Sequence, residues 1–217
     1  MNRWINKDTE IYCSFAETAG NTGCQMMNTA FHYYGLNKIY KSFSVKSIED
    51  AVNAVKVLDI KGFAITMPYK IDVLNYVDDM SDSVKEIGAA NTVLNFNKGF
   101  LHAYNTDAYA VTTLLDEYDN RKKLYIIGNG GYSKAVKWGA YDCRFETEII
   151  TRSNWNEIYD IRDSVVYNCT PVDITNMVHN SNDFINCLVE SETGKKLAKL
   201  QASKQFEMYT SRLKFPL

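Results

Sequence analysis

Short apolar runs alternate with segments of helical periodicity along most of this 217-residue chain. The runs have the length of buried strands, and the segments between them repeat apolar residues at helical spacing. Strand-like runs cover 11–15, 39–43, 62–67, 93–94, 100–104, 124–127, 148–151 and 164–168. Helical patterns cover 25–34, 47–58, 108–118, a segment that opens at 133, and 194–213. Strands and helices that alternate in this way predict an α/β fold.

A strand, a glycine turn and a helix follow one another near the middle of the chain. The apolar run 124–127 meets Gly128-Asn129-Gly130-Gly131, and a helical pattern opens at Ser133. In such a turn Gly128 reverses the chain and Gly130 lets backbone approach a ligand, while the first N–H groups of the helix suit a phosphate. The alternative is a turn that is merely rich in glycine.

The segment Thr151-Arg152-Ser153 indicates which dinucleotide this turn would bind. It follows the next strand, about 20 residues past the glycines, where dinucleotide folds contact the adenosine ribose. NAD sites place an acidic residue there, whereas a guanidinium and two hydroxyls attract a 2′-phosphate. The predicted cofactor is therefore NADP. Ser133 stands where the fingerprint has Gly or Ala, so we expect the helix to lie slightly further from the strand.

Composition excludes several classes of protein. The formal charge of −2 comes without a basic run, which argues against a nucleic-acid partner. No stretch has the apolar length of a membrane span, and the N-terminus has no signal-peptide region, so we expect a cytoplasmic protein without a membrane partner. The five cysteines form no C-x-x-C pair and the three histidines do not cluster with them. We expect reduced thiols and no metal site.

Several polar residues stand where predicted strands end. Thr66, Lys70 and Asp107 follow strands, and Asn91 precedes one. In open α/β sheets ligands bind beyond the carboxyl ends of strands, so these side chains are candidates for a binding site. Structural alternatives stay open: Asp107 or Thr106 as a helix cap, Asn91 as a turn residue, and Lys70 as a solvated charge.

The last predicted helix carries an apolar stripe with two glutamines beside it. Gln201 and Gln205 lie one position from that stripe. They are either ordinary surface residues or amides that reach a ligand hydroxyl from the edge of a buried face.

A set of motifs in fixed order is similar to the shikimate dehydrogenase family. They are GFAITMPYK at 62–70, IGAANT at 87–92, YNTD at 104–107, GNGGYSKA at 128–135, TRS at 151–153, NCTP at 168–171 and QASKQF at 201–206. The opening segments 5–9 and 19–23 resemble the shikimate-dehydrogenase-like branch, whose members can be poor shikimate oxidisers. The resemblance spans most of the chain.

The resemblance implies a role for each matched position. Lys70 and Asp107 would form the proton-transfer pair beside the reacting hydroxyl, and Ser14, Thr66, Asn91 and Gln201 would hold the substrate. The positions matched to cofactor binding are Gly128, Asn129, Gly130, Gly131, Tyr132, Ser133, Thr151, Arg152, Ser153, Asn168 and Thr170. An ammonium held against a carboxylate can relay the proton of a secondary alcohol without a metal.

Two departures from the family bear on activity. The family's Ser-x-Ser-Pro substrate loop is replaced by Ser14-Phe15-Ala16-Glu17, so one hydroxyl is lost and a negative charge is added. The segment after Pro171 is short and lacks the family's Asp-x-x-Tyr-x-Pro stretch. The resemblance thus implies a shortened nucleotide lobe.

The sequence therefore predicts two α/β lobes. Residues 1–108 with 193–217 would bind substrate, 109–192 would form a Rossmann-type NADP lobe, and the C-terminal helix would pack back on the first lobe. The expected activity is NADP-dependent oxidation of shikimate or a close cyclic polyol acid, by a monomer or homodimer. The alternative is a sensor that binds NADP or another ligand without turnover.

Overall fold

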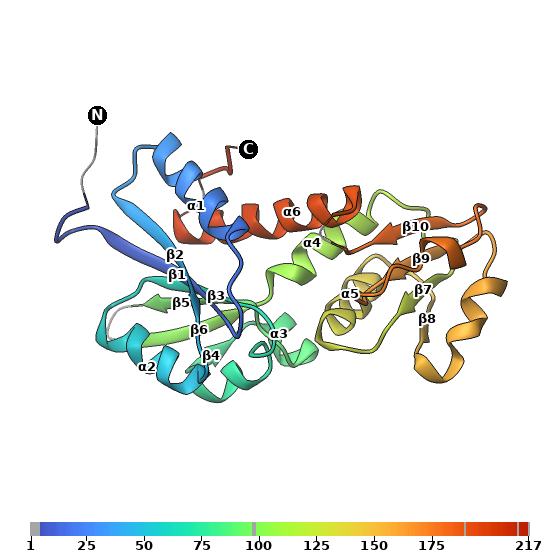
Figure 1. Ribbon diagram of the computed structural model, residues 1–217, viewed down its shortest axis with the longest axis horizontal. Coiled ribbons are helices and arrows are strands. Elements are labelled where there is room, and N and C mark those ends of the chain that lie inside the picture. The colour runs from blue at the N-terminus through green and yellow to red at the C-terminus, as the bar shows by residue number, and fades with distance from the viewer. Residues whose placement is uncertain (1–4, 97–98, 189, 212, 217) are drawn as a thin grey trace. The chain divides into compact units, whose positions relative to one another are not determined.

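The computed structural model describes residues 5–96, 99–188, 190–211 and 213–216. The chain divides into two compact units, residues 1–106 with 202–217 and residues 107–201 (Figure 1). The lobe boundaries predicted from the sequence lie close to this division but differ in the C-terminal helix. As boundaries of functional domains they stay a prediction.

In the described part of the first unit, six strands form one mixed sheet in the order β2-β1-β3-β5-β6-β4. The elements of this unit, in chain order, are β1 (Glu10–Ala16), α1 (Thr22–Tyr33), β2 (Lys38–Ser44), α2 (Ile48–Val57), β3 (Gly62–Ile65), the 3₁₀ turn η1 (Asp72–Tyr76), β4 (Asp79–Met80), α3 (Asp82–Ile87), β5 (Thr92–Phe96) and β6 (Phe100–Tyr104). β1 is parallel to β2 and β3, whereas β5 is antiparallel to both of its neighbours. The ends of β1, β3 and β6 and the start of β5 therefore share one edge.

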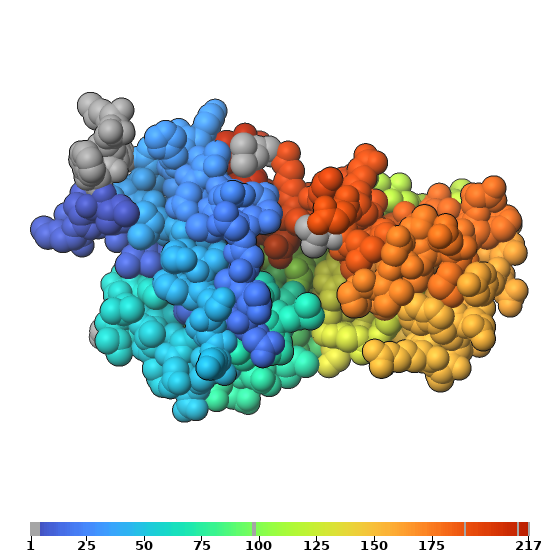
Figure 2. All heavy atoms as spheres, in the orientation of Figure 1, coloured from blue at the N-terminus to red at the C-terminus, as the bar shows by residue number. Residues whose placement is uncertain are grey.

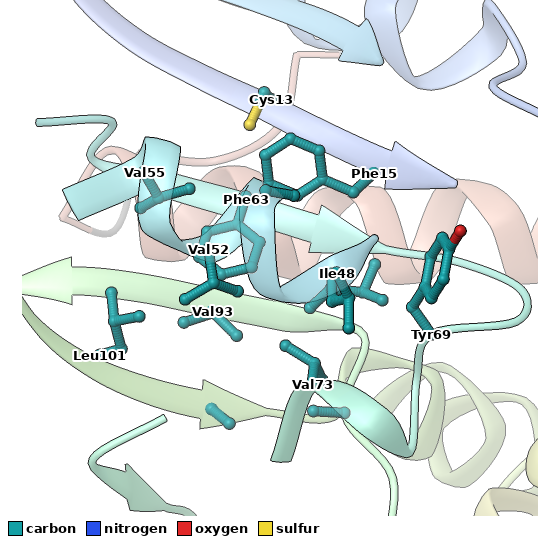
Figure 3. Packing of buried hydrophobic residues seen from close by; sticks show 14 of the residues in the cluster. Cys13, Phe15, Ile48, Val52, Val55, Phe63, Tyr69, Val73, Val93 and Leu101 are labelled. Atoms are coloured by element: carbon teal, nitrogen blue, oxygen red, sulfur yellow. The ribbon is translucent and has the colours of Figure 1, made fainter. Parts of the chain in front are cut away.

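Strand alternation divides the core of the first unit between the two faces of the sheet. Cys13 and Phe15 of β1 and Phe63 of β3 face α2, which contributes Val52 and Val55 (Figure 3). The rings of Phe15 and Phe63 are 5.4 Å apart between centroids. On the opposite face, Tyr12 packs in a cluster with residues of α1 and of the helix α6 (Glu192–Tyr209).

The C-terminal half of α6 belongs to the first unit, as the sequence predicted. Ala202, Phe206 and Tyr209 are buried in the cluster with Tyr12, and the Tyr12 hydroxyl donates to the Tyr209 carbonyl at 3.0 Å. Close packing here needs a glycine, because a Cβ atom at Gly62 would lie 2.8 Å from the Tyr209 ring.

In the described part of the second unit, four parallel strands form a sheet in the order β10-β9-β7-β8. Its elements are α4 (Thr106–Leu115), β7 (Leu124–Ile127), α5 (Gly131–Asp142), β8 (Thr147–Ile150), η3 (Arg152–Asp160), β9 (Val165–Asn168), η4 (Thr175–Met177), β10 (Asp183–Asn186) and the first part of α6. The first strand, β7, lies between β8 and β9. Chain connections therefore leave the sheet in opposite directions beside the end of β7, the position at which such sheets bind ligands.

The predicted elements are present, with shifted ends. The helix expected at 108–118 begins at Thr106 and ends at Leu115, and the helix expected at 194–213 ends at Tyr209. The predicted strand 148–151 ends at Ile150, so Arg152 begins a 3₁₀ segment. The sequence reasoning missed β10, which lies in the short segment after Pro171 and completes the parallel sheet.

Candidate functional site

Four of the predicted substrate and catalytic residues meet at the shared edge of the first sheet. We call Ser14, Thr66, Lys70 and Asn91 the strand-end cluster. Main-chain hydrogen bonds hold it together: the Thr66 N–H donates to Phe15 O at 3.0 Å, Ile65 N–H to Asn91 O at 2.8 Å, and Ala90 N–H to Lys70 O at 2.8 Å. Residues from three stretches of the chain are thus brought side by side, including Thr66 and Lys70, which the sequence placed at a strand end.

Asn91 is buried and its carboxamide oxygen accepts three hydrogen bonds. The donors are the Thr92 hydroxyl at 2.9 Å, the Thr106 N–H at 2.8 Å and the Thr106 hydroxyl at 3.2 Å. Thr92 in turn accepts from Gln205 Nε2 at 2.9 Å. Asn91 is therefore more than a turn residue, because its side chain is anchored from two other segments. Gln205 is not the surface residue that the sequence left open, since it is 4% exposed.

A buried tyrosine lies near Ser14 on the neighbouring strand. Tyr40 of β2 is buried near Ser14, and burial raises the pKa of its hydroxyl well above the ordinary value, with Ser14 opposing the shift. Tyr40 thus stays neutral and can both donate and accept. Beyond Ser14, Ala16 is buried and Glu17 is exposed, with its N–H donating to Met67 O at 3.3 Å. The main chain of Glu17, which stands where the family has Pro, is therefore bonded to the turn that follows Thr66.

Asp107 and Gln201 fall in the second unit and are described there. Asp107 is 8% exposed in the first turn of α4. Because that helix begins at Thr106, neither Thr106 nor Asp107 takes the position before the helix that a capping residue would hold. Burial chiefly raises the pKa of Tyr132, and the negative charge of Asp107 adds to the effect. Asp107 therefore lies within electrostatic reach of the start of α5. Gln201 is half-buried on α6.

The glycine turn has the geometry that a dinucleotide needs. Gly128 has φ +107°, a conformation that favours glycine, and a Cβ atom there would lie 2.9 Å from Thr170 Cγ2. Cβ atoms at Gly130 and Gly131 would meet nothing within 4 Å. The N-terminus of α5 has no side-chain cap and no acidic residue in its first turn. Its N–H groups and the open space above the glycines therefore fit a phosphate.

The other predicted cofactor segments flank this turn. The Gly128 N–H donates to Ile150 O at 2.8 Å, beside Thr151, and the Cys169 N–H donates to Ile127 O at 2.9 Å. Arg152 is exposed at the start of η3, a segment at the surface of the second unit (Figure 2). Arg152 forms no ion pair with any described residue, so its guanidinium is available to an anion.

Some residues matched to cofactor binding have internal partners. The fully buried Asn168 accepts from the Thr170 N–H at 3.0 Å and the Thr170 hydroxyl at 2.8 Å, and donates to Val172 O at 2.9 Å. The Thr151 N–H donates to Asn154 Oδ1 at 2.8 Å. These side chains shape the loops after β8 and β9.

Ser133 and Tyr132 lie beneath the turn. The buried Ser133 hydroxyl donates to Gly130 O at 2.7 Å, which satisfies it within the first turn of α5. The Tyr132 hydroxyl lies 2.9 Å from that of Tyr167, which is fully buried. Tyr132 therefore contributes its main chain to the turn, while its ring anchors α5 to the sheet.

Neither a metal site nor a membrane span is found in the part of the chain that the structure describes. No group of three His, Cys, Asp or Glu side chains there could hold a metal ion. No helix among the same residues has the length and hydropathy to cross a membrane.

Comparison with known proteins identifies the family. Residues 22–93 match the shikimate dehydrogenase substrate binding domain. A shikimate dehydrogenase-like protein of Haemophilus influenzae is 40% identical over 134 residues, which are 61% of this chain and 49% of that protein. These matches support the resemblance to the shikimate dehydrogenase family that the motifs indicated. The chain spans about half the length of the curated relatives it matches.

Solved structures extend the likeness to both units. The structure of a shikimate 5-dehydrogenase-like protein matches 99% of this chain and 95% of its own, with a TM-score of 0.86 and 27% identity. The Thermus thermophilus shikimate 5-dehydrogenase in complex with NADP(H) and shikimate matches 94% of this chain and 95% of its own, with a TM-score of 0.82 and 18% identity, and supports the fold alone. The Pyrococcus furiosus shikimate dehydrogenase (NADP(+)) is 36% identical over 138 residues, 62% of this chain and 51% of that protein. The predicted family, branch and α/β fold are confirmed.

The sequence reasoning missed Tyr40, Thr92 and Tyr167. Tyr40 and Tyr167 lie inside strand-like runs, where an aromatic residue is expected to pack. Thr92 did carry a signal, because it directly follows Asn91 at the start of a strand. What its hydroxyl contacts, however, depends on α6, more than 100 residues away in the chain.

Proposed function

We propose that this protein is an NADP-dependent oxidoreductase that interconverts shikimate and 3-dehydroshikimate, or a closely related cyclic polyol acid. The strand-end cluster carries the proposal, because it gathers an ammonium, two hydroxyls and an anchored carboxamide on one sheet edge. Such donors suit the carboxylate and ring hydroxyls of a small polar substrate. The relatives named above as NADP(+)-dependent shikimate dehydrogenases support the same reaction class.

In the proposed reaction Lys70 and Asp107 act as the proton-transfer pair. The resemblance to the family supports this pairing, and Thr106, which directly precedes Asp107, donates its N–H to Asn91 within the first unit. Lys70 polarises the substrate oxygen and takes or returns its proton, with Asp107 as its carboxylate partner. Ser14, Thr66, Asn91 and Gln201 orient the substrate by hydrogen bonds.

NADP would be held at the carboxyl edge of the second sheet. The first-turn N–H groups of α5 would bind the pyrophosphate, and Arg152 with Thr151 and Ser153 would bind the 2′-phosphate. Asn168 and Thr170 would act by shaping the loop against Gly128. When bound, the nicotinamide supplies the hydride acceptor or donor.

A spectrophotometric assay tests the proposal. We expect NADPH consumption with 3-dehydroshikimate and NADPH formation with shikimate, and slower or no formation with quinate. If wild-type protein turns over none of these acids, the activity is refuted for this substrate class.

A second function, NADP or ligand sensing without turnover, is favoured by Glu17. Ala16 and Glu17 stand where the family has Ser and Pro, so one hydroxyl is lost, and the added negative charge disfavours an anionic substrate. Glu17→Pro combined with Ala16→Ser discriminates the two. An enzyme hindered by Glu17 gains turnover in the double variant, whereas a sensor binds NADP and stays inactive in both forms.

A further inference from the structure

A buried chain of hydrogen bonds connects helix α6 to Asn91 within the first unit. Gln205 Nε2 donates to Thr92 Oγ1 at 2.9 Å, and Thr92 Oγ1 donates to Asn91 Oδ1 at 2.9 Å. Gln205, Thr92 and Asn91 are 4%, 0% and 2% exposed. Buried polar groups need partners, and a leucine at Gln205 would suit the apolar face of α6 better. The amide at this place therefore needs a reason beyond packing.

The direction of the chain follows from one unambiguous donor. The Thr106 main-chain N–H, which can only donate, lies 2.8 Å from the side-chain end of Asn91. The Asn91 atom that faces it must be the carboxamide oxygen, so Nδ2 points to the other side. Because Oδ1 also receives the Thr106 hydroxyl at 3.2 Å, its acceptor capacity is filled from within the protein.

Thr92 has a single hydroxyl proton. It can form the hydrogen bond to Asn91 Oδ1 only if it is not donated to another acceptor. Gln205 leaves it available because the amide group that faces Thr92 is Nε2, a donor. An acceptor at the same place would take the Thr92 proton and leave Asn91 Oδ1 with one donor fewer. Whether position 205 presents a donor or an acceptor to Thr92 therefore decides whether Thr92 donates to Asn91.

We propose that Gln205 is a positioning residue which, by leaving the Thr92 proton to Asn91, helps Thr106 hold the Asn91 carboxamide with its oxygen inward and its Nδ2 on the ligand side. Because the carboxamide oxygen of Asn91 is used by Thr92 and Thr106, Nδ2 is the only side-chain group of Asn91 that a ligand could contact by hydrogen bonding. The ligand group opposite Asn91 is therefore an acceptor: a carboxylate, a carbonyl or a hydroxyl oxygen that receives a proton. The identity of that ligand rests on the proposed function, whereas the relay itself does not.

Nuclear magnetic resonance of protein labelled with ¹⁵N-asparagine tests the relay without any assumption about activity. Asn91→Asp, which lacks the NH₂ group, assigns the Asn91 side-chain signals by their disappearance. Gln205→Met removes the donor at similar length, and Gln205→Glu replaces it with an acceptor. Thr92→Val removes the hydroxyl at equal shape, and Thr92→Ser is the matched control that retains it.

We expect the Asn91 NH₂ signals to move in Gln205→Glu and Thr92→Val, and to stay near their wild-type positions in Thr92→Ser. Gln205→Met leaves the Thr92 proton on Asn91 and should move the signals less than Gln205→Glu. The double variant Gln205→Glu/Thr92→Val should move them no further than Thr92→Val alone, because both changes break the same chain of hydrogen bonds. Unmoved signals in folded Gln205→Glu overturn the proposal, and if that variant does not fold, unmoved signals in Thr92→Val overturn it.

Kinetics add a second readout where turnover exists. In Gln205→Glu, Asn91 loses the hydrogen bond from Thr92, which should raise KM for shikimate about three- to tenfold with kcat nearly unchanged. A fall in kcat alone would contradict a positioning role. If wild-type protein has no turnover, the proposed function fails while the Asn91 signals still decide the relay.

Discussion

Lys70 is held in the strand-end cluster by its main chain, because its carbonyl accepts a hydrogen bond from the Ala90 N–H next to Asn91. Its side chain can therefore be changed without removing that anchor. We expect Lys70→Met, which retains much of the apolar stem, to lower turnover by roughly 10²- to 10⁴-fold because the proton relay is lost. NADP affinity, measured by fluorescence titration, should stay within twofold. Normal turnover in Lys70→Met would contradict a catalytic role and favour the alternative that Lys70 is a solvated charge.

Asp107 separates a catalytic from a structural role most directly. Because it lies in the first turn of α4, its charge stabilises the helix by only about 0.3 to 1 kcal/mol. Asp107→Asn should therefore unfold in urea with nearly wild-type stability and yet turn over shikimate poorly, since an amide cannot accept a proton. A stable variant with wild-type turnover would assign Asp107 to the helix alone.

Arg152 is expected to set the preference for NADP over NAD. A charged hydrogen bond to the 2′-phosphate contributes about 1.5 to 3 kcal/mol, so Arg152→Ala should weaken NADP binding by roughly ten- to a hundredfold. NAD binding should hardly change, as measured by titration of both cofactors. The exposed Arg144 offers a control, because Arg144→Ala removes the same charge away from the glycine turn. Equal losses for both cofactors in Arg152→Ala would contradict recognition of the phosphate.

At the scale of elements, the packing of α6 on the first sheet depends on the absence of a side chain at Gly62. A methyl group there would press on the rings of Tyr209 and Tyr12, at 2.8 and 3.2 Å. Both rings are buried and cannot move far. Gly62→Ala should lower the free energy of unfolding by about 1 to 3 kcal/mol, measured by urea denaturation.

Gly23→Ala is the matched control for that variant. A Cβ atom at Gly23 meets nothing within 4 Å, and the residue lies in α1. Alanine favours a helix over glycine by up to about 1 kcal/mol, so this variant should be as stable as wild type or slightly more so. Equal destabilisation of both variants would mean that Gly62 has no special contact with α6.

Elements with a strong local pattern could be predicted from the sequence, and short ones could not. The run 124–127 and the glycine turn after it are visible because strand length, Gly128 and the helix start agree. β4 has two residues and β10 has four, and their pairing with distant strands, rather than local composition, defines them. The ends of α4 and α6 were missed by a few residues because helix ends depend on tertiary contacts.

Some features of the candidate site could likewise be predicted from the sequence, and others could not. Strand ends singled out Thr66 and Lys70, a strand start singled out Asn91, and the family resemblance added Ser14; the structure brings these four residues to one edge of the sheet. The hydrogen-bond chain through Gln205 could not be predicted, because it depends on which face of α6 packs against β5. An apolar stripe defines a buried face to within one residue position, and Gln205 lies one position from the predicted stripe.

At the scale of the whole molecule, the two units have separate cores, and the strand-end cluster and the glycine turn lie in different units. The clusters around Phe63 and Tyr12 stabilise the first unit, and those around Ile126 and Ile127 stabilise the second. A ligand slows exchange only at those amides whose opening requires its release. Hydrogen exchange should therefore map each ligand separately.

We expect NADP to protect the amides of 127–133 and 151–153, and shikimate to protect those of 14–17, 64–70 and 90–93. At a ligand concentration of 100 times Kd the added stability is about 2.7 kcal/mol, which slows exchange roughly a hundredfold at these amides. The Gly128 N–H, bonded to Ile150 O, reports the first site, and the Ala90 N–H, bonded to Lys70 O, reports the second. Mass spectrometry of peptides after timed exchange measures both at once. Arg152→Ala should reduce protection by NADP at an equal concentration while protection by shikimate persists. Protection of 64–70 by NADP with none at 127–133 would contradict the assignment of the cofactor to the glycine turn.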